Sequence, residues 1–120
     1  MIQREGPGWR LAIDPARQPY QALIGADNWA LELKLAELEQ LRAICAEIIN
    51  QHSSIADQLM AEEQIEICLE RDCWWLELKG DKQHWSLRFV LSGAGRGAEG
   101  GWDTSASQAF SQALALGGGF

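Results

Sequence analysis

The sequence predicts an α+β fold in the order three strands, a long helix, four strands and a short helix. Three observations predict it. Apolar and polar residues alternate in the N-terminal part, a helical period replaces the alternation near residue 38, and alternation returns at residue 65 before a last helical segment. The length of 120 residues fits a single domain, residues 1–120. We therefore expect two successive units, each with antiparallel strands followed by a helix.

The N-terminal part is predicted to form three strands. Residues 9–14 (WRLAID) alternate apolar and polar side chains, and Pro15 ends this strand because proline cannot continue a ladder. Residues 21–25 (QALIG) form a short second strand. A turn at 25–28 (GADN) leads into residues 29–34 (WALELK), which alternate again and close a hairpin.

A long helix is predicted over residues 35–62. Its apolar stripe advances in steps of three and four, and consists of Leu38, Leu41, Cys45, Ile48, Ile55 and Leu59, with His52 in the remaining place. Glu37 and Glu39 stand near its start, where carboxylates favour the positive end of the helix dipole. We expect His52 to be a core or interface histidine rather than a metal ligand.

The second half is predicted to begin with an antiparallel meander over residues 65–70, 74–79 and 84–91. Its alternation leaves one buried face and one polar face. Trp75 is the exception, because its position in the alternation places this apolar ring on the polar face. Three interpretations are open: a cover supplied by the short helix or a second subunit, stacking against a nucleic-acid base, or simple exposure.

The glycine-rich stretch VLSGAGRGAEGGWD, residues 90–103, follows the meander. Gly93, Gly95 and Ala98 match the spacing of a dinucleotide-binding fingerprint. That fold needs a crossover helix and a further strand, and only 17 residues follow Asp103. The position of the stretch therefore argues against a phosphate cradle.

We predict instead a hairpin whose glycine-rich return strand ends on an inward-facing Trp102. A mobile loop is the alternative, with Arg96 and Glu99 touching a partner. Asp103 is a good N-cap for the final helix, and the glycines at 117–119 end it.

Composition and charge exclude several classes of protein. A net charge of −7 opposes non-specific nucleic-acid binding, which relies on lysine and arginine. No apolar run is long enough to cross a membrane, and the N-terminus lacks a signal-peptide pattern, so we expect a cytoplasmic protein. The three cysteines, Cys45, Cys68 and Cys73, show no zinc spacing and are expected to be thiols. The sequence indicates no metal, no cofactor and no catalytic residue.

Six segments together carry a resemblance: GWRLA, YQALIGADNWALEL, EEQIEI, WWLELKG, WSLRFVLS and RGAEGGWD. They resemble a small cyanobacterial protein family of unknown function, over nearly the whole chain. The resemblance implies the fold of Pur-alpha and the plant whirly transcription regulators, a duplicated strands-plus-helix unit that often serves as a scaffold for single-stranded DNA. The family implies no activity.

The sequence favours a non-enzymatic interaction module, with an unknown protein partner. The alternative is single-stranded nucleic-acid binding by the sheet face that carries Trp75, Lys79 and Arg88. Arg96 and Glu99 complete the candidate contact residues. A third interpretation is small-ligand or nucleotide binding at the glycine-rich residues 93–101.

Overall fold

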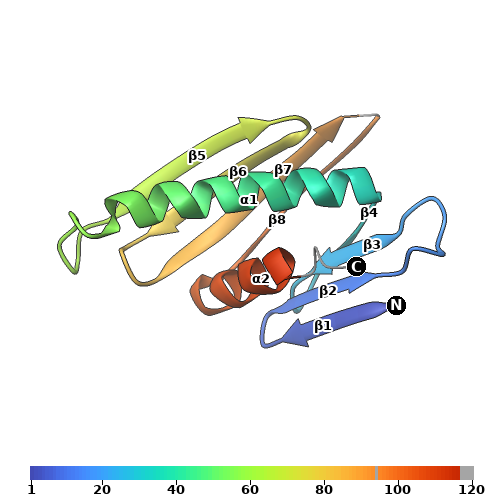
Figure 1. Cartoon of the computed structure of the whole chain (residues 1–120), viewed down its shortest axis with the longest axis horizontal. Helices are drawn as coiled ribbons and strands as arrows, with labels where there is room; N and C mark the ends of the chain where they lie inside the picture. Colours follow the sequence, from blue (N-terminus) through green and yellow to red (C-terminus); the bar gives the residue numbers. More distant parts are fainter. Residues whose placement is uncertain (94, 117–120) are drawn as a thin grey trace.

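The computed structural model, which describes residues 1–93 and 95–116, contains two four-stranded antiparallel sheets and two helices (Figure 1). The first sheet pairs its strands in chain order, and they are β1 (Ile2–Gly6), β2 (Trp9–Ile13), β3 (Ala22–Gly25) and β4 (Ala30–Leu33). The second sheet does the same, with β5 (Ile65–Arg71), β6 (Trp74–Gly80), β7 (Trp85–Gly93) and β8 (Arg96–Trp102). The predicted α+β class with antiparallel sheets is confirmed.

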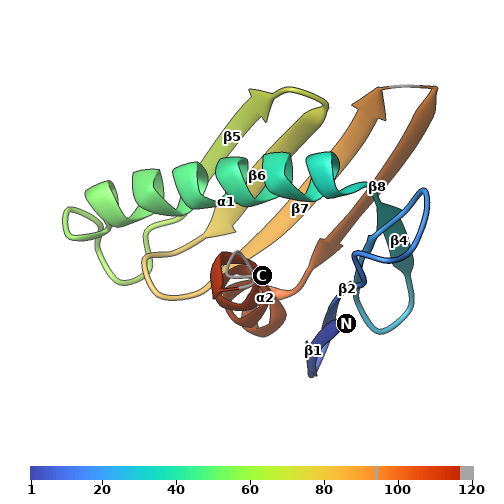
Figure 2. The ribbon, with the colours of Figure 1, turned by 45° about the vertical axis from the view of Figure 1, so that its right-hand side comes forward.

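Each sheet is followed by a helix, α1 (Leu35–Ala56) after the first and α2 (Thr104–Leu116) after the second. Both helices cover one face of the second sheet, where α1 lies across β5 and β6 and α2 packs on β7 (Figures 1 and 2). The α2 helix also contacts β2, so it joins the two sheets. None of the described helices is long and apolar enough to cross a membrane.

The predicted order of three strands before the long helix is wrong, because β1 precedes them. Residues Gln3, Arg4 and Glu5 of this strand are exposed, so it shows little apolar alternation. The strand exists because it pairs with β2 along its whole length, from Ile2 opposite Ile13 to Gly6 opposite Trp9. An edge strand of this kind is specified by pairing rather than by its own pattern.

The helix α1 is shorter than the predicted 35–62, because it ends at Ala56. Asp57 caps it, and hydrogen-bonded turns follow, in which Gln58 donates to the carbonyl of Ile55. The predicted apolar stripe is buried from Leu38 to His52, whereas the later members are only half-buried. At the start, the Glu37 carboxylate accepts the backbone N–H of Lys34, as in a capping box.

The core lies between the helices and the two sheets, and aromatic rings fill its centre. The Trp102 ring stacks on Phe110 at 4.0 Å between centroids and contacts Phe89 at 5.5 Å. Trp29, from the turn before β4, lies 5.3 Å from Trp102. Its indole donates to the carbonyl of Gly101 in the second sheet. The predicted inward orientation of Trp102 is confirmed, since only 4% of the residue is exposed.

A buried hydroxyl joins α2 to the second sheet. Ser107 Oγ accepts the backbone N–H of Leu87 and donates to the carbonyl of Trp102, each at 2.9 Å.

Ser107→Ala leaves both backbone groups without this partner in a buried site. We expect the free energy of unfolding to fall by about 2 kcal/mol in urea denaturation. Ser105→Ala is the control: its exposed hydroxyl donates to the Asp103 carboxylate, so a change of about 0.5 kcal/mol or less is expected. Equal losses in the two variants would contradict the prediction.

Candidate functional site

The candidate site is the outer face of the second sheet, which lies on the side away from both helices. Alternation along β6 buries Trp74, with 1% exposed, and turns Trp75 outward. Lys79 and Arg88 are exposed on the same face, and so is Glu99 on β8. The structure therefore brings these four candidate residues onto one surface. The alternation of the meander predicts this for Trp75, Lys79 and Arg88, whereas Glu99 was a candidate of the glycine-rich stretch. Their role as contacts stays a prediction.

Trp75 is only half-buried, and Arg88 is its neighbour on this face. The Arg88 guanidinium lies 4.8 Å from the centre of the Trp75 ring, in a cation–π arrangement. Arg88 Nε also contacts the Glu77 carboxylate at 3.4 Å. The short helix does not cover Trp75, because α2 packs on the opposite face of the sheet. The half-buried ring thus contacts Arg88 and is not covered by either helix.

Arg96, the fifth candidate residue, has its side chain turned into the molecule. Its Nη1 donates to the Glu37 carboxylate at 2.8 Å, and its Nη2 donates to the carbonyl of Glu32 in β4. The guanidinium also lies 4.7 Å from the ring centre of Tyr20. Arg96 therefore links β8, α1 and β4. Sequence reasoning missed this role, since the acceptors are more than fifty residues away along the chain.

The glycine-rich stretch forms the predicted hairpin. Residues 96–102 pair antiparallel with β7, from Arg96 opposite Gly93 to Trp102 opposite Leu87. Gly93 and Gly95 have positive φ values of 145° and 80°, which glycine adopts at low cost in a turn. Ala94 lies outside the described residues. The turn leads into a strand and not into a helix, so the strand–turn–helix cradle of a dinucleotide site is not formed there. Small-ligand binding at residues 93–101 stays a prediction.

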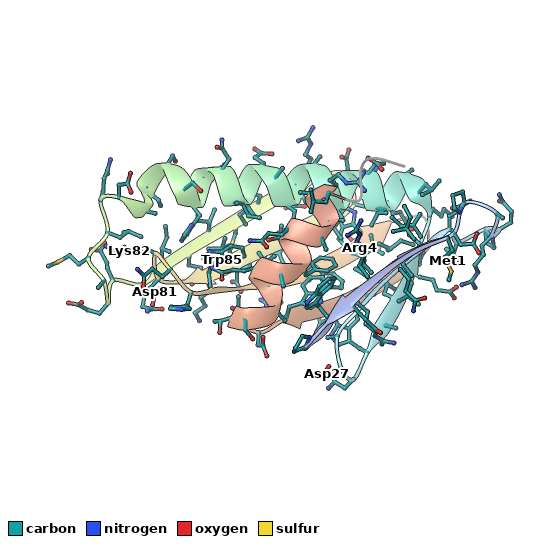
Figure 3. The ribbon with its side chains drawn as sticks, turned by 60° about the horizontal axis from the view of Figure 1, so that its bottom comes forward. Met1, Arg4, Asp27, Asp81, Lys82 and Trp85 are labelled. Carbon is teal, nitrogen blue, oxygen red and sulfur yellow. The ribbon has the colours of Figure 1, made fainter. Side chains whose placement is uncertain are left out.

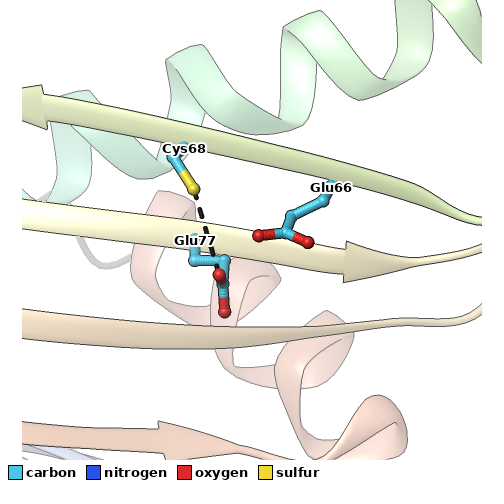
Figure 4. Close-up of side chains that lie close together, drawn as sticks. All are labelled: Glu66, Cys68 and Glu77. Carbon is cyan, nitrogen blue, oxygen red and sulfur yellow. Dashed lines mark hydrogen bonds between the residues drawn. The ribbon is translucent and has the colours of Figure 1, made fainter.

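One group of possible metal ligands lies on the outer face among the described residues. Glu66, Cys68 and Glu77 place one ligand atom each within 4.8 Å of one another (Figure 4). Cys68 Sγ lies 3.9 Å from a carboxylate oxygen of Glu77, because the two residues are paired across β5 and β6. Sequence spacing did not show this group, since its members come from two strands. A thiolate and two carboxylates are ligands that zinc accepts.

The three thiols differ in their surroundings. Burial raises the pKa of Cys45 to about 12. Desolvation, followed by the carboxylates of Glu77 and Glu66, raises the pKa of Cys68, which is exposed. Cys73 is half-buried and donates to the side chain of Gln40. Desolvation also raises the pKa of Cys73, and a raised pKa lowers the thiolate fraction of a cysteine at neutral pH.

Alkylation by neutral iodoacetamide tests the electrostatics of Cys68. Glu77→Gln removes a neighbouring negative charge, so the pKa of Cys68 falls and its alkylation rate at pH 8 is expected to rise roughly threefold. Arg88→Gln removes a positive charge that lowers this pKa, so the rate is expected to fall. Mass spectrometry after timed quenching identifies the labelled residue. Rates that move in the same direction in both variants would contradict the assignment.

A groove of about 570 Å³ lies between α1 and α2. Buried Cys45 and Trp85 are among its lining residues, as are Ile49 and Leu114, together with alanine, amide and hydroxyl side chains. Arg42 also lines it and donates from Nε to the carbonyl of Leu114. The groove has the mixed lining of a helix crossing, and it does not include any of the predicted contact residues.

His52 has a structural role at the far end of α1. Its Nε2 lies 3.0 Å from the carbonyl oxygen of Asp81, and its ring lies 5.9 Å from that of Trp85. Figure 3 shows Asp81, Lys82 and Trp85 at this end of the molecule, away from Met1. Backbone N–H groups of His84 and Gln83 hold the pKa of the Asp81 carboxyl below its ordinary value. The expected core position of His52 is confirmed by its 5% exposure.

Comparison with known proteins places the chain in a family. Residues 4–116 match the domain of unknown function DUF1818, so the chain belongs to that family. A crystal structure described as a protein with unknown function from the DUF155 family of Prochlorococcus sp. NATL2A is similar over 95% of this chain and 96% of that one. The two share 38% sequence identity, with a TM-score of 0.90. No curated protein matches. The expected family of unknown function is thus confirmed, and no activity can be assigned from it.

Proposed function

We propose that this member of the DUF1818 family is a non-enzymatic interaction module whose protein partner binds the outer face of the second sheet. One observation carries the proposal: Trp75, a large ring, lies on a sheet face from which both helices are absent. Aromatic and arginine side chains are enriched where proteins bind one another, and Trp75 and Arg88 are in contact here. The raised pKa values of the thiols also favour a role without nucleophilic catalysis.

Affinity capture from native cell extract, with and without nuclease, tests the proposal. The wild-type chain is expected to retain a specific protein after nuclease treatment, and Trp75→Ala and Arg88→Ala baits are expected to lose it. Arg4→Ala is the matched control, since it removes one positive charge from exposed β1 in the other sheet (Figure 3). Capture that is equal in all baits would contradict the proposed face. A specific turnover in a metabolite screen would contradict the non-enzymatic role.

Single-stranded nucleic acid is the second candidate, and the cation–π contact of Arg88 with Trp75 favours it. An exposed ring beside a guanidinium can stack a base and hold a phosphate. This candidate predicts salt-sensitive binding of oligonucleotides that is lost in Trp75→Ala and Arg88→Ala. Fluorescence anisotropy with a labelled oligo(dT) at low salt measures it, and an unchanged anisotropy would exclude it.

We propose further that the fold is the Pur-alpha and whirly arrangement. The repeat of four antiparallel strands and a helix supports this, since it matches the duplicated unit that the resemblance implies. We also propose a cyanobacterial origin and a cytoplasmic location. The relative from Prochlorococcus supports the origin. Three free thiols, including exposed Cys68, support a reducing compartment.

A further inference from the structure

One row of side chains crosses the outer face of the second sheet from edge to edge. Strand register places Glu70 of β5 opposite Trp75, Trp75 opposite Val90, and Val90 opposite Glu99 of β8. The two central members are half-buried and the two outer members are exposed. The row therefore presents an apolar centre, with the Arg88 guanidinium over the Trp75 ring, between two carboxylates, one on each edge strand.

The two carboxylates at the ends of the row have no cation of their own among the described residues. Arg88 contacts Glu77, and Arg71 contacts Glu47, so these arginines do not pair with Glu70 or Glu99. Glu66 is a further exposed carboxylate on the face, and Lys79 lies opposite it in the strand register. The face thus has an excess of negative charge, which a cationic partner would complement.

The spacing of the row matches an extended segment that crosses the strands. Neighbouring strands lie about 4.8 Å apart, so the outer strands are separated by roughly 14 Å. In an extended segment, residues i and i+4 are also separated by roughly 14 Å at about 3.4 Å per residue. Residue i+2 faces the same side as these two. A segment with basic residues at i and i+4 and an apolar residue at i+2 fits the row.

We infer that the partner presents such a basic, amphipathic, extended segment to the row Glu70–Trp75–Val90–Glu99. This inference rests on the proposed function of the outer face. The apolar side chain of the segment contacts Trp75 and Val90, and its two cations contact Glu70 and Glu99. A nucleic-acid strand fits less well, because its phosphates would meet a carboxylate at each end of the row.

Two blocked peptides of equal composition test the spacing, SRSLSRS and SSRLRSS. In the second, the leucine faces the side opposite to the arginines. We expect SRSLSRS to bind at least about threefold more tightly, with NMR shifts at the amides of the row and at the Trp75 indole. The double variant Glu70→Gln, Glu99→Gln is expected to weaken this binding about fivefold. The control double variant Glu5→Gln, Glu63→Gln removes the same charge from exposed sites elsewhere and is expected to bind as the wild type does.

Several outcomes would overturn the inference. One is an equal loss of peptide affinity in the two double variants, and another is an equal affinity of the wild type for the two peptides. A third is the absence of NMR shifts at about 5 mM peptide, and a fourth is displacement of the bound peptide by oligo(dT). These outcomes differ from failure of the proposed function. If the Trp75→Ala bait loses the captured protein but the Glu70→Gln, Glu99→Gln bait retains it, the proposed interaction face is supported. The same result refutes the proposal that the partner presents a basic segment. Capture unaffected by Trp75→Ala refutes the face itself.

Discussion

Arg96→Ala is expected to lower the free energy of unfolding by about 3–5 kcal/mol, which is a large part of the total for a domain of this size. Arg96 and Glu37 form a partly buried ion pair, with 22% and 11% of their side chains exposed. Removal of the arginine leaves the Glu37 carboxylate with one backbone donor, the N–H of Lys34, and leaves the Glu32 carbonyl without the guanidinium. Urea denaturation followed by circular dichroism measures the loss.

Arg88→Ala is the matched control for this prediction. Its ion pair with Glu77 is exposed, since 55% of the Arg88 side chain is accessible, so a loss below about 1 kcal/mol is expected. A double-mutant cycle of Arg96→Ala with Glu37→Gln is expected to give a coupling energy of at least about 1 kcal/mol. Additive losses in that cycle would show that Arg96 acts through its contacts with Tyr20 and the Glu32 carbonyl and not through the ion pair.

Trp102→Ala is expected to cost about 3–5 kcal/mol of unfolding free energy. The substitution removes a ring that contacts Phe89, Phe110 and Trp29 at the centre of the core. It also removes the indole that donates to the carbonyl of Gly25 at 2.9 Å. Urea denaturation measures the loss, and the variant is expected to unfold at a lower urea concentration.

Two variants separate the contributions of the ring and of its hydrogen bond. Trp102→Phe keeps an aromatic ring but leaves the Gly25 carbonyl without its donor, so a loss of about 1–3 kcal/mol is expected. Trp75→Ala removes a ring of the same kind from the outer face and is expected to cost about 1 kcal/mol or less. If Trp75→Ala lowers the free energy of unfolding as much as Trp102→Ala does, then Trp75 stabilises the fold, and its exposure would not indicate a binding role.

Much of the fold follows from local pattern. Alternation correctly assigned Trp74 and Trp75 to opposite faces, because a strand has a strict period of two. The alternation of apolar and polar residues did not predict β1, because its polar residues form a strand through pairing with β2.

The candidate site was predicted only in part, for a related reason. Alternation placed Trp75, Lys79 and Arg88 on one face, since a meander with short turns keeps its faces continuous. It did not place Glu99 there, because Glu99 joins this face only through the pairing of β8 with β7. The inward turn of the Arg96 side chain depends on Glu37, which a different element supplies. Contacts between elements depend on how the sheets and helices pack, and the sequence pattern of one element does not contain that information.

The side chains that join β4 to β8 also affect how the protein can associate. Trp29 donates to the backbone of Gly101, and Arg96 donates to the backbone of Glu32, so indole and guanidinium groups occupy carbonyls where a further strand would pair. Open strand edges promote aggregation and strand exchange. Within the described sheets, this leaves β1 and β5 as the edges open to another chain. Both carry charged side chains, which disfavour the addition of a strand from another chain at these two edges.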